Sequence, residues 1–202
     1  TNISDYFLDL PSVDINDKDG EGRTLLHIIL SSKNDNTLKM ATLLVVEKNA
    51  STEVVDSSGH TLFHLLANTP HKDDLALAEL LFNSGAPINT ATTDGVRPLD
   101  SAVTSGNITI FRFLLENNAE IVVPKEKKNL LHAIAAQKVY CKSFFEILSA
   151  QLREKGKESL LKEMANAVDE TGRTPLLLYF ESAPSSLISG AKYLDNEVNS
   201  DE

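Results

Sequence analysis

The sequence contains no tryptophan, eight phenylalanines, four tyrosines and a single cysteine. This shortage of aromatic residues predicts a core built from leucine, isoleucine, valine and alanine. Cys141 has no second cysteine in the chain with which to form a disulfide, so nothing in the sequence requires an oxidising compartment. We therefore expect the protein in the cytoplasm or the nucleus.

Long apolar runs and an excess of basic residues are also absent. No run approaches the 18 residues that indicate a membrane-spanning helix, and the amino terminus does not resemble a signal peptide. The 19 Lys and Arg are outnumbered by 29 Asp and Glu, which gives a net charge of −10. Affinity for phosphate groups comes from clusters of Lys and Arg, so this charge argues against binding to nucleic acid or to anionic membranes. We expect neither nucleic-acid binding nor membrane insertion.

One short phrase occurs five times along the chain. Its clear copies are DGEGRTLLH (19–27), DSSGHTLFH (56–64) and DETGRTPLL (169–177), and its looser copies are TTDGVRPLD (92–100) and PKEKKNLLH (124–132). The residues at one shared position are separated by 37, 36, 32 and 45 residues: Thr24, Thr61, Arg97, Asn129 and Thr174. A period near 33 residues with variable insertions indicates a repeat protein.

The phrase and the residues that follow it resemble the ankyrin repeat, which has the pattern D-x-x-G-x-T-P-L-H, a helix, and then L-L-x-x-G-A-x-V-N. The second half fits LLFNSGAPIN (80–89) and LLENNAEI (114–121) closely, and fits Leu43-Leu44 with Asn49-Ala50 more loosely. The resemblance runs from about Tyr6 to about Phe180. It implies an all-α fold, an ankyrin-repeat solenoid of stacked helix-turn-helix units with hairpin-like turns.

The resemblance also divides the chain into segments. We expect a partial capping repeat at residues 1–18 and a weak terminal helix with an acidic tail at residues 183–202. Between them we expect repeats at residues 19–55, 56–91, 92–123, 124–168 and 169–182 onward. The fourth repeat has Lys127 in place of the turn glycine and an insertion at residues 153–162.

Each repeat should contain two short helices. The expected first helices are residues 24–32, 61–68, 98–105, 130–137 and 175–181, and the expected second helices are residues 38–48, 75–84, 108–117 and 142–152. The helical spacing of Leu160, Leu161, Met164, Ala165 and Val168 predicts an additional short helix after the insertion. The polar loops at residues 33–37 and 70–74 are longer than the family norm.

Three histidines recur at one position of the phrase, namely His27, His64 and His132. They do not suit a metal site, because metal ligands must lie within about 2.0–2.2 Å of one ion, whereas stacked helices lie about 10 Å apart. The resemblance implies instead that each histidine bonds to the neighbouring turn. Cys141 lacks an orienting group nearby, and the sequence has no phosphate loop, dinucleotide motif or metal-ligand spacing. We expect no catalytic residue, metal or cofactor in this chain.

Ankyrin proteins typically bind partners on their concave face, which consists of the turn tips and the exposed side of the first helices. Carried over copy by copy, this face contains Glu21, Arg23, Ser32, Ser58, His60, Asn68, Thr69, Asp94, Thr104, Ser105, Lys125, Lys128, Gln137 and Arg173. Arg23, His60, Lys128 and Arg173 follow the turn glycine or its replacement, and we call them the basic column. This column suggests an acidic or phosphorylated protein segment as the partner. Alternatively, its side chains are solvated or pair with the neighbouring acids Glu21, Asp94 and Glu170.

These observations predict a monomeric, non-enzymatic protein-interaction module. Because the sequence begins at Thr1 and ends in the polar stretch DNEVNSDE, we expect an excised piece of a longer protein, which could itself be an enzyme. The alternative is a regulatory or spacer domain that packs on another domain of its parent protein, such as an enzyme or channel. An exposed apolar surface around Leu178, Tyr179 and Phe180 would favour that alternative, unless residues 185–194 cover it.

Overall fold

The computed structural model describes residues 14–182 apart from residues 33, 126 and 138. Within these residues the regular secondary structure is helical, with one isolated antiparallel bridge between Val55 and Thr61. The expected all-α fold is therefore confirmed. None of the described helices is both long and apolar enough to cross a bilayer. The chain forms two compact units, residues 1–120 and residues 121–202, which are described separately.

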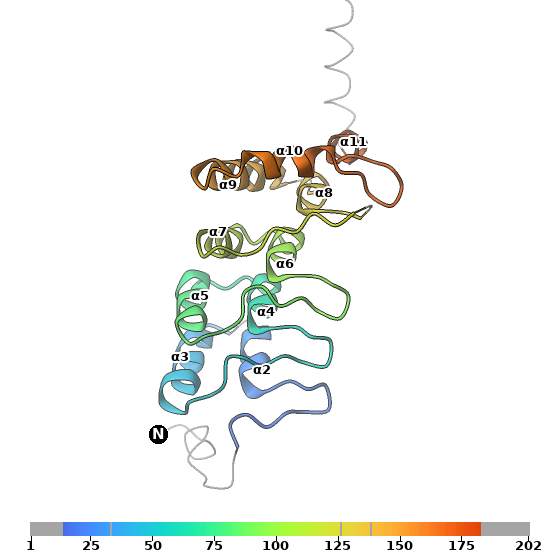
Figure 1. Cartoon of the computed structure of the whole chain (residues 1–202). Coiled ribbons are helices and arrows are strands. Elements are labelled where there is room, and N and C mark those ends of the chain that lie inside the picture. Colours follow the sequence, from blue (N-terminus) through green and yellow to red (C-terminus); the bar gives the residue numbers. More distant parts are fainter. Residues whose placement is uncertain (1–13, 33, 126, 138, 183–202) are drawn as a thin grey trace, which may run out of the picture. The chain divides into compact units, whose positions relative to one another are not determined.

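The first unit contains three helix pairs. The first helices of the pairs are α2 (Leu25–Ser31), α4 (Leu62–Asn68) and α6 (Pro98–Ser105), and the second helices are α3 (Thr37–Thr42), α5 (Asp74–Asn83) and α7 (Ile108–Glu116). Helix α3 continues as the π-helical turn η1 (Leu43–Glu47). Figure 1 shows α2, α4 and α6 in one row and α3, α5 and α7 in a second row. Each predicted helix in this unit is present within two residues at its start, and only the predicted helix 38–48 changes helix type.

Packing between successive pairs stabilises these helices. Helices of six to ten residues are marginal in water, so they depend on burial against neighbours. Helix α4 contacts α2, α5 and α6, and α5 also contacts α3 and α7. Gly106 ends α6 at a φ of 78°, as its predicted role in a sharp turn requires, because this left-handed conformation is costly for residues with a Cβ atom.

The core is not purely aliphatic. Leucine and alanine are its most frequent residues, but the largest fully buried side chains are Phe63, Phe111 and Phe144. Phe63 stacks on Phe113 with 6.1 Å between ring centroids. The core therefore follows the predicted leucine, isoleucine and alanine composition, with four buried phenylalanines added: Phe63, Phe111, Phe113 and Phe144.

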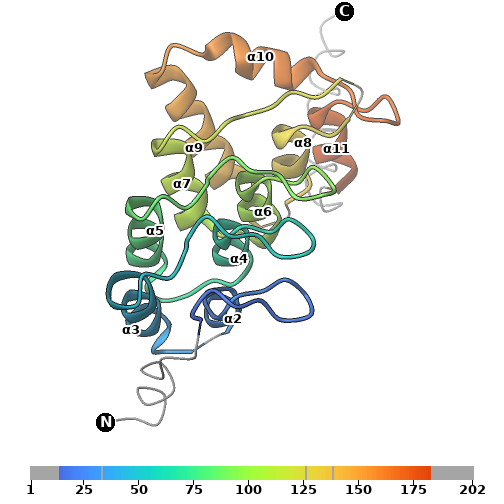
Figure 2. The ribbon, with the colours of Figure 1, turned by 60° about the horizontal axis from the view of Figure 1, so that its bottom comes forward.

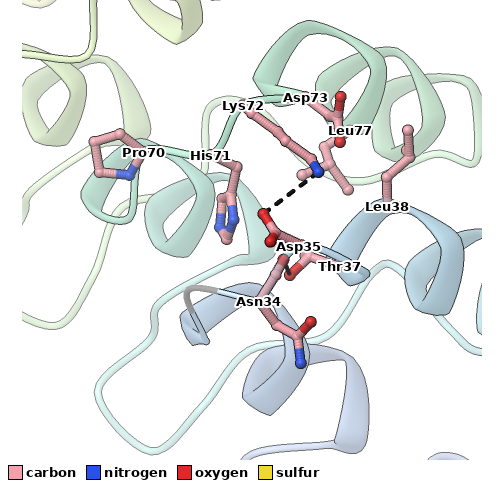
Figure 3. Close-up of a pocket in the computed structure, with 9 residues that line it drawn as sticks. All are labelled: Asn34, Asp35, Thr37, Leu38, Pro70, His71, Lys72, Asp73 and Leu77. Carbon is pink, nitrogen blue, oxygen red and sulfur yellow. Dashed lines mark hydrogen bonds and ion pairs between the residues drawn. The ribbon is translucent and has the colours of Figure 1, made fainter.

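The two extended loops meet at one end of the first two helix pairs. Figure 3 shows them around a small cleft of about 130 Å³, with an ion pair between Lys72 Nζ and Asp35 Oδ1 at 3.4 Å. His71 belongs to the second loop, and its Nε2 is 3.0 Å from the Leu30 carbonyl oxygen at the end of α2. Since a carbonyl only accepts, His71 Nε2 carries the proton and donates it. The second loop is thereby bonded to the preceding helix pair.

A buried carboxylate extends this connection to the third pair. The His71 backbone N–H donates to Asp74 Oδ1 at 3.0 Å, and the Asn107 side-chain amide donates to Asp74 Oδ2 at 2.9 Å. The same amide lies 3.3 Å from the Leu66 carbonyl, and Asn107 Oδ1 accepts from the Ile110 N–H at the start of α7. Burial raises the pKa of Asp74, while these donors act in the opposite direction. Asn107 thus caps one helix and satisfies a carboxylate of the preceding pair.

The described part of the second unit contains four helices, α8 (Leu130–Ala135), α9 (Cys141–Glu154), α10 (Glu158–Asn166) and α11 (Pro175–Ser182). Figure 2 shows α8 beside α11, and these two helices contact each other. The additional helix predicted after the insertion is confirmed as α10, which is anchored by the fully buried Met164. Val168 lies beyond its end because the backbone is already extended at Ala167. The predicted capping helix before residue 14 and the terminal segment after residue 182 lie outside the described residues.

We predict that Asn107→Ala lowers the free energy of unfolding by about 2 kcal/mol, because it removes a helix cap and leaves Oδ2 of the buried Asp74 carboxylate without its donor. Urea unfolding followed by circular dichroism measures this loss. Asn83→Ala is the matched control, since Asn83 is exposed at the end of α5 and should change stability by less than about 0.5 kcal/mol. Equal losses in the two variants would contradict the assigned role of Asn107.

Candidate partner-binding surface

The turns are built around the recurring histidines. The backbone N–H groups of Thr24, Thr61 and Asn129 donate to Nδ1 of the histidine three residues later, with N–N distances of 3.1, 3.0 and 3.2 Å. Because Nδ1 accepts, the proton of each neutral ring is on Nε2. His64 Nε2 donates it to the Val96 carbonyl at 2.9 Å, and His132 Nε2 donates it to the Arg173 carbonyl at 2.9 Å. The predicted bond from histidine to the neighbouring turn is confirmed for these two residues.

His27 differs from the other two histidines. Its Nε2 is buried and makes no hydrogen bond to any described residue. The His60 backbone stands where the third turn has Val96. It lies close enough to raise the pKa of His27, which offsets part of the decrease caused by burial. Burial is the largest influence on both His27 and His64, and it lowers their pKa below the ordinary value of 6.5. Both rings are therefore neutral near pH 7.

In the third turn, Arg97 and Asp100 stand where the first, second and fourth turns have a threonine or asparagine followed by a histidine three residues later. Asp100 Oδ2 accepts the Arg97 backbone N–H at 3.1 Å, so the bond within the turn is kept by a carboxylate instead of an imidazole. Burial raises the pKa of Asp100. The Arg97 guanidinium reaches Glu120 at 3.8 Å, and its Nε is buried without a hydrogen-bond partner among the described residues.

Aspartates that recur at the start of the phrase hold the turn tips together. Asp19 Oδ1 accepts from the backbone N–H groups of Glu21 and Arg23, both at 2.9 Å, and Asp56 and Asp169 make the corresponding bonds. Adjacent tips in the first unit are also bonded, because the Ser57 N–H donates to the Glu21 carbonyl at 2.9 Å. Gly22 has a φ of 73°, and a Cβ atom there would lie 2.9 Å from Ser57 N. Glycine is required at this tip for conformation and for space.

The fourth turn has a different backbone. Among the described residues, positive φ occurs at seven glycines but at only two other residues, Asn49 and Asn118. Lys127, which occupies the place of the turn glycine, therefore does not adopt the glycine conformation. This difference follows from the steric cost of left-handed backbone for a residue with a long side chain.

Three members of the basic column are paired with acids in their own turn or the following helix. Arg23 bonds to Asp19 at 2.8 Å and to Glu21 at 2.8 Å. His60 Nδ1 lies 3.0 Å from Asp56 Oδ2. Arg173 bonds to Asp169 at 3.1 Å and to Glu181 at 3.0 Å. Lys128 is exposed and forms no ion pair with any described residue. These pairs fit the alternative interpretation of the column, but Glu21 is the one anticipated acid among these partners. The other partners, Asp19, Asp56, Asp169 and Glu181, were not anticipated.

These pairs also change the titration of the turn aspartates. Hydrogen bonds from Arg23 hold the pKa of Asp19 below its ordinary value of 3.8. The pKa of Asp169 is lowered strongly, first by the Thr171 hydroxyl and then by the Thr171 and Arg173 donors. The carboxylates therefore stay ionised at neutral pH and keep the arginines neutralised.

The remaining predicted contact residues are small and polar. Asn68, Thr104 and Ser105 are exposed at the ends of α4 and α6, while Ser32, Thr69 and Gln137 are half-buried. The hydroxyls of Ser32 and Thr104 donate to carbonyls of their own turns or helices, and the Ser105 hydroxyl donates to the Ala67 carbonyl at 2.6 Å. Ser105 thus also connects two helix pairs, a role that sequence reasoning missed. At the tips, Asp94 and Lys125 are exposed, and the Ser58 carbonyl accepts the Thr93 N–H at 3.0 Å.

The predicted contact residues divide between the two units. The ten from Glu21 to Ser105 belong to the first unit, and Lys125, Lys128, Gln137 and Arg173 belong to the second. Within the first unit, the repeat of helices and turns brings corresponding residues of successive pairs to corresponding positions. The described residues contain no group of three or more His, Cys, Asp or Glu that could hold a metal ion.

Comparison with known families agrees with this architecture. A family model described as ankyrin repeats, with three copies, matches residues 29–125. Residues 29–125 belong to the ankyrin-repeat family. The matched region includes the end of α2 from Ile29 onward, all of α3 to α7 and the beginning of the fourth turn. The count of five repeats stays a prediction, because the family model covers three. No curated protein matches the chain.

Cys141 is the first residue of α9. It is half-buried, and burial raises the pKa of its thiol. A raised pKa disfavours the thiolate, which is the nucleophilic form. The local environment therefore favours a packing role for Cys141 over a nucleophilic one.

We predict that the protein loses stability as the pH falls below about 6.5, where unfolded histidines begin to bind protons that folded His27 and His64 do not bind. A histidine whose pKa is lower in the folded protein than in the unfolded protein contributes stability. This contribution is fully present above the pKa of the unfolded histidine and is lost as the pH falls toward the pKa of the folded one. The slope is at most about 1.4 kcal/mol per pH unit for each histidine. Urea unfolding at pH 7.5 and pH 5.5 measures the effect.

His64→Gln is the test variant, because glutamine offers an acceptor and a donor but does not titrate. Its loss of stability between the two pH values should be smaller than that of the wild type. Asp74 and Asp100 have raised pKa values and change stability in the opposite direction with pH, but they are present in both proteins and cancel in the comparison. Identical pH dependence in the two proteins would show that His64 has an ordinary pKa.

Proposed function

We propose that this chain is a non-enzymatic protein-interaction module, part of a larger protein, that binds a segment of a partner protein on its concave face. Ankyrin repeats generally mediate protein–protein interaction. The observation that carries the proposal is the row of exposed polar residues at the ends of successive first helices, where Ser31, Asn68 and Thr104 stand at corresponding positions. The opposite sides of these helices are buried in the stack, so this side is available to a partner.

The hypothesis of an acidic or phosphorylated partner rests on Lys125 and Lys128. Both are exposed, and neither has an ion-pair partner among the described residues. Residues 121–202 carry 11 basic and 12 acidic side chains, whereas residues 1–120 carry 8 basic and 17 acidic ones. The second unit would thus repel an acidic segment less than the first unit would. Arg23 and Arg173 support the hypothesis weakly, because bound carboxylates already neutralise them.

We also propose that the module is a monomer that needs no cofactor and works in the cytoplasm or the nucleus. The single cysteine supports this location, because no disulfide within the chain has to be maintained. Hydroxyl groups at the helix ends, such as those of Ser31, Ser32 and Thr104, donate hydrogen bonds to carbonyls of the same chain. This supports a rigid surface instead of a catalytic centre.

A second candidate function is a regulatory or spacer domain that packs on another domain of its parent protein. One observation favours it: helix α11 exposes Leu176, Leu177, Tyr179 and Phe180. An exposed apolar group of this kind often marks an interface. Under this function the α11 surface, and not the concave face, makes the essential contact.

We predict that Asn68→Arg with Thr104→Arg weakens partner binding at least about tenfold, because two bulky cations would stand where the partner segment lies. Partners are captured from cell extract, identified by mass spectrometry and purified, and their dissociation constants are measured by calorimetry. Glu79→Arg is the matched control on α5, since Glu79 is exposed on a second helix. Equal binding by all three proteins would exclude the concave face as the site.

The partner's charge has a separate test. For an acidic partner, Lys125→Glu with Lys128→Glu should weaken binding about tenfold, since each exposed ion pair is worth up to about 1 kcal/mol. Lys157→Glu makes the same kind of charge change at an exposed site in the same unit and should leave binding unchanged. Binding that is insensitive to both changes, and to salt, would exclude an acidic partner while leaving the protein-interaction function intact.

A further inference from the structure

The segments that lead into the turns are bonded to one another in the first unit. The Ser51 N–H donates to Asn16 Oδ1 at 2.8 Å, which joins the segment before the second turn to the segment before the first. The Thr52 hydroxyl donates to the Ser84 carbonyl at 2.6 Å, which joins it to the segment before the third turn. Successive segments of this unit therefore satisfy one another's polar groups.

This bonding requires a segment of sufficient length. In the first unit, residues 48–55 lie between η1 and the second copy of the phrase, and residues 84–91 lie between α5 and the third copy. In the second unit, α10 ends at Asn166 and the phrase begins again at Asp169, so only two residues lead into the fifth turn. The chain after α10 is too short to bond along residues 121–124, which lead into the fourth turn.

The backbone ahead of the fourth turn is consequently open. The N–H groups of Val122, Val123 and Lys125 make no hydrogen bond to any described residue. Residues 121–124 have no regular secondary structure, and Figure 2 shows them in the stretch without coils that precedes α8. A row of unpaired backbone groups can pair with an extended segment of another chain.

A cleft of about 450 Å³ lies beside this open backbone, and we call it the turn cleft. Its lining includes four apolar side chains, one cation and one acid: Val123, Pro124, Ala167, Val168, Lys125 and Glu163. The cleft is open to solvent, whereas a pocket for a small molecule buries roughly 70–90% of its ligand. The turn cleft therefore suits a protein segment that lies across it.

Hydrogen bonds hold the two sides of the turn cleft in place. The Asn129 side-chain amide, at the end of the fourth turn, donates to the Met164 carbonyl in α10 at 2.9 Å. His132 donates to the Arg173 carbonyl of the fifth turn at 2.9 Å. Both sides are thus fixed before a partner arrives, which reduces the ordering cost of binding.

The charges around the turn cleft favour an acid on one side only. Lys125 and Lys128 of the fourth turn are exposed, and neither forms an ion pair with a described residue. Glu163 of α10 and Glu170 of the fifth turn are exposed on the other side and would repel an acid. Charge complementarity therefore places a carboxylate of the partner at Lys125.

We propose that the turn cleft binds an extended partner segment that carries an aliphatic residue and an Asp or Glu two positions apart. In an extended segment these two side chains lie on the same face. The aliphatic side chain enters between Val123 and Val168, the carboxylate pairs with Lys125, and the segment's backbone bonds to the open N–H groups. This assignment rests on the proposed protein-interaction function and places its acidic contact in the second unit.

Peptide selection on the full chain tests this assignment. The probe is a phage-displayed library of random octapeptides, sequenced before and after selection. We expect sequences with an aliphatic residue and an acid two positions apart to be enriched at least about tenfold. Fluorescence anisotropy then gives the dissociation constants of labelled copies of the enriched peptides.

Charge reversal gives the sharpest comparison. Selection on Lys125→Glu should replace Asp and Glu by Lys and Arg at the enriched acidic position, because the contact then attracts a cation. A purely structural role of Lys125 would not reverse the preference. Lys157→Glu makes the same charge change at an exposed site of the same unit and should leave the preference unchanged.

The apolar contact has its own pair of variants. Val168→Asp should weaken the enriched peptides at least about tenfold, because it puts a charge in the apolar wall. Val139→Asp is the matched control, since Val139 is 77% exposed in the same unit and does not line the turn cleft. Circular dichroism shows whether both variants keep the fold. If Val168→Asp unfolds, the reversal by Lys125→Glu still decides, because Lys125 is exposed.

Several results would overturn the assignment. They are the absence of enrichment, and enrichment of acidic peptides without an aliphatic preference, which would indicate charge attraction alone. Peptides lost on Asn68→Arg with Thr104→Arg but retained by Val168→Asp would exclude the turn cleft and leave the proposed function in place. A dimer in sedimentation that Val168→Asp dissociates would assign the turn cleft to a second copy. The proposed function itself has a separate readout in calorimetry with captured partners.

Discussion

A histidine that bonds in two directions is the interaction on which the turns depend. In the second turn, His64 Nδ1 accepts the Thr61 N–H at the start of its own helix, and Nε2 donates to the Val96 carbonyl of the next turn. His132 does the same for Asn129 and Arg173 within the second unit. One side chain thereby satisfies a free amide at a helix start and fixes the spacing to the following turn. Short helices that would not persist alone are held in register for packing.

The opposite ends of the helices have their own polar connection in the first unit. His71, Asp74 and Asn107 link three successive helix pairs through the second loop and the start of α7. Polar groups at both ends of the helices are therefore largely used inside the array, and so are most cations of the basic column. Under the proposed function, a partner would contact the small exposed side chains of the first unit, and an acidic partner would contact Lys125 and Lys128 of the second unit.

The sequence predicted the elements better than it predicted the surface chemistry. Helix α6 begins and ends at the predicted residues, and α10 was found from the spacing of Leu160, Leu161 and Met164, because apolar periodicity reports directly on burial. The pairing of Arg23 with Asp19 was missed, since it depends on a turn that brings side chains four residues apart together. The bonds of Asp74 to Asn107 were missed because 33 residues separate them in the chain. The contact residues themselves were carried over from family resemblance and stay a prediction.

The state of the histidine rings tests this account most directly. Long-range ¹H–¹⁵N correlation spectra of the imidazoles at pH 7.5 distinguish a proton on Nε2 from a proton on Nδ1. The account predicts that His64 and His132 are both in the Nε2–H form, with an Nε2 proton that exchanges slowly with water. A proton on Nδ1 in either residue, or an Nε2 proton that exchanges as fast as that of an exposed imidazole, would contradict the bond between successive turns and the stacking that we derive from it.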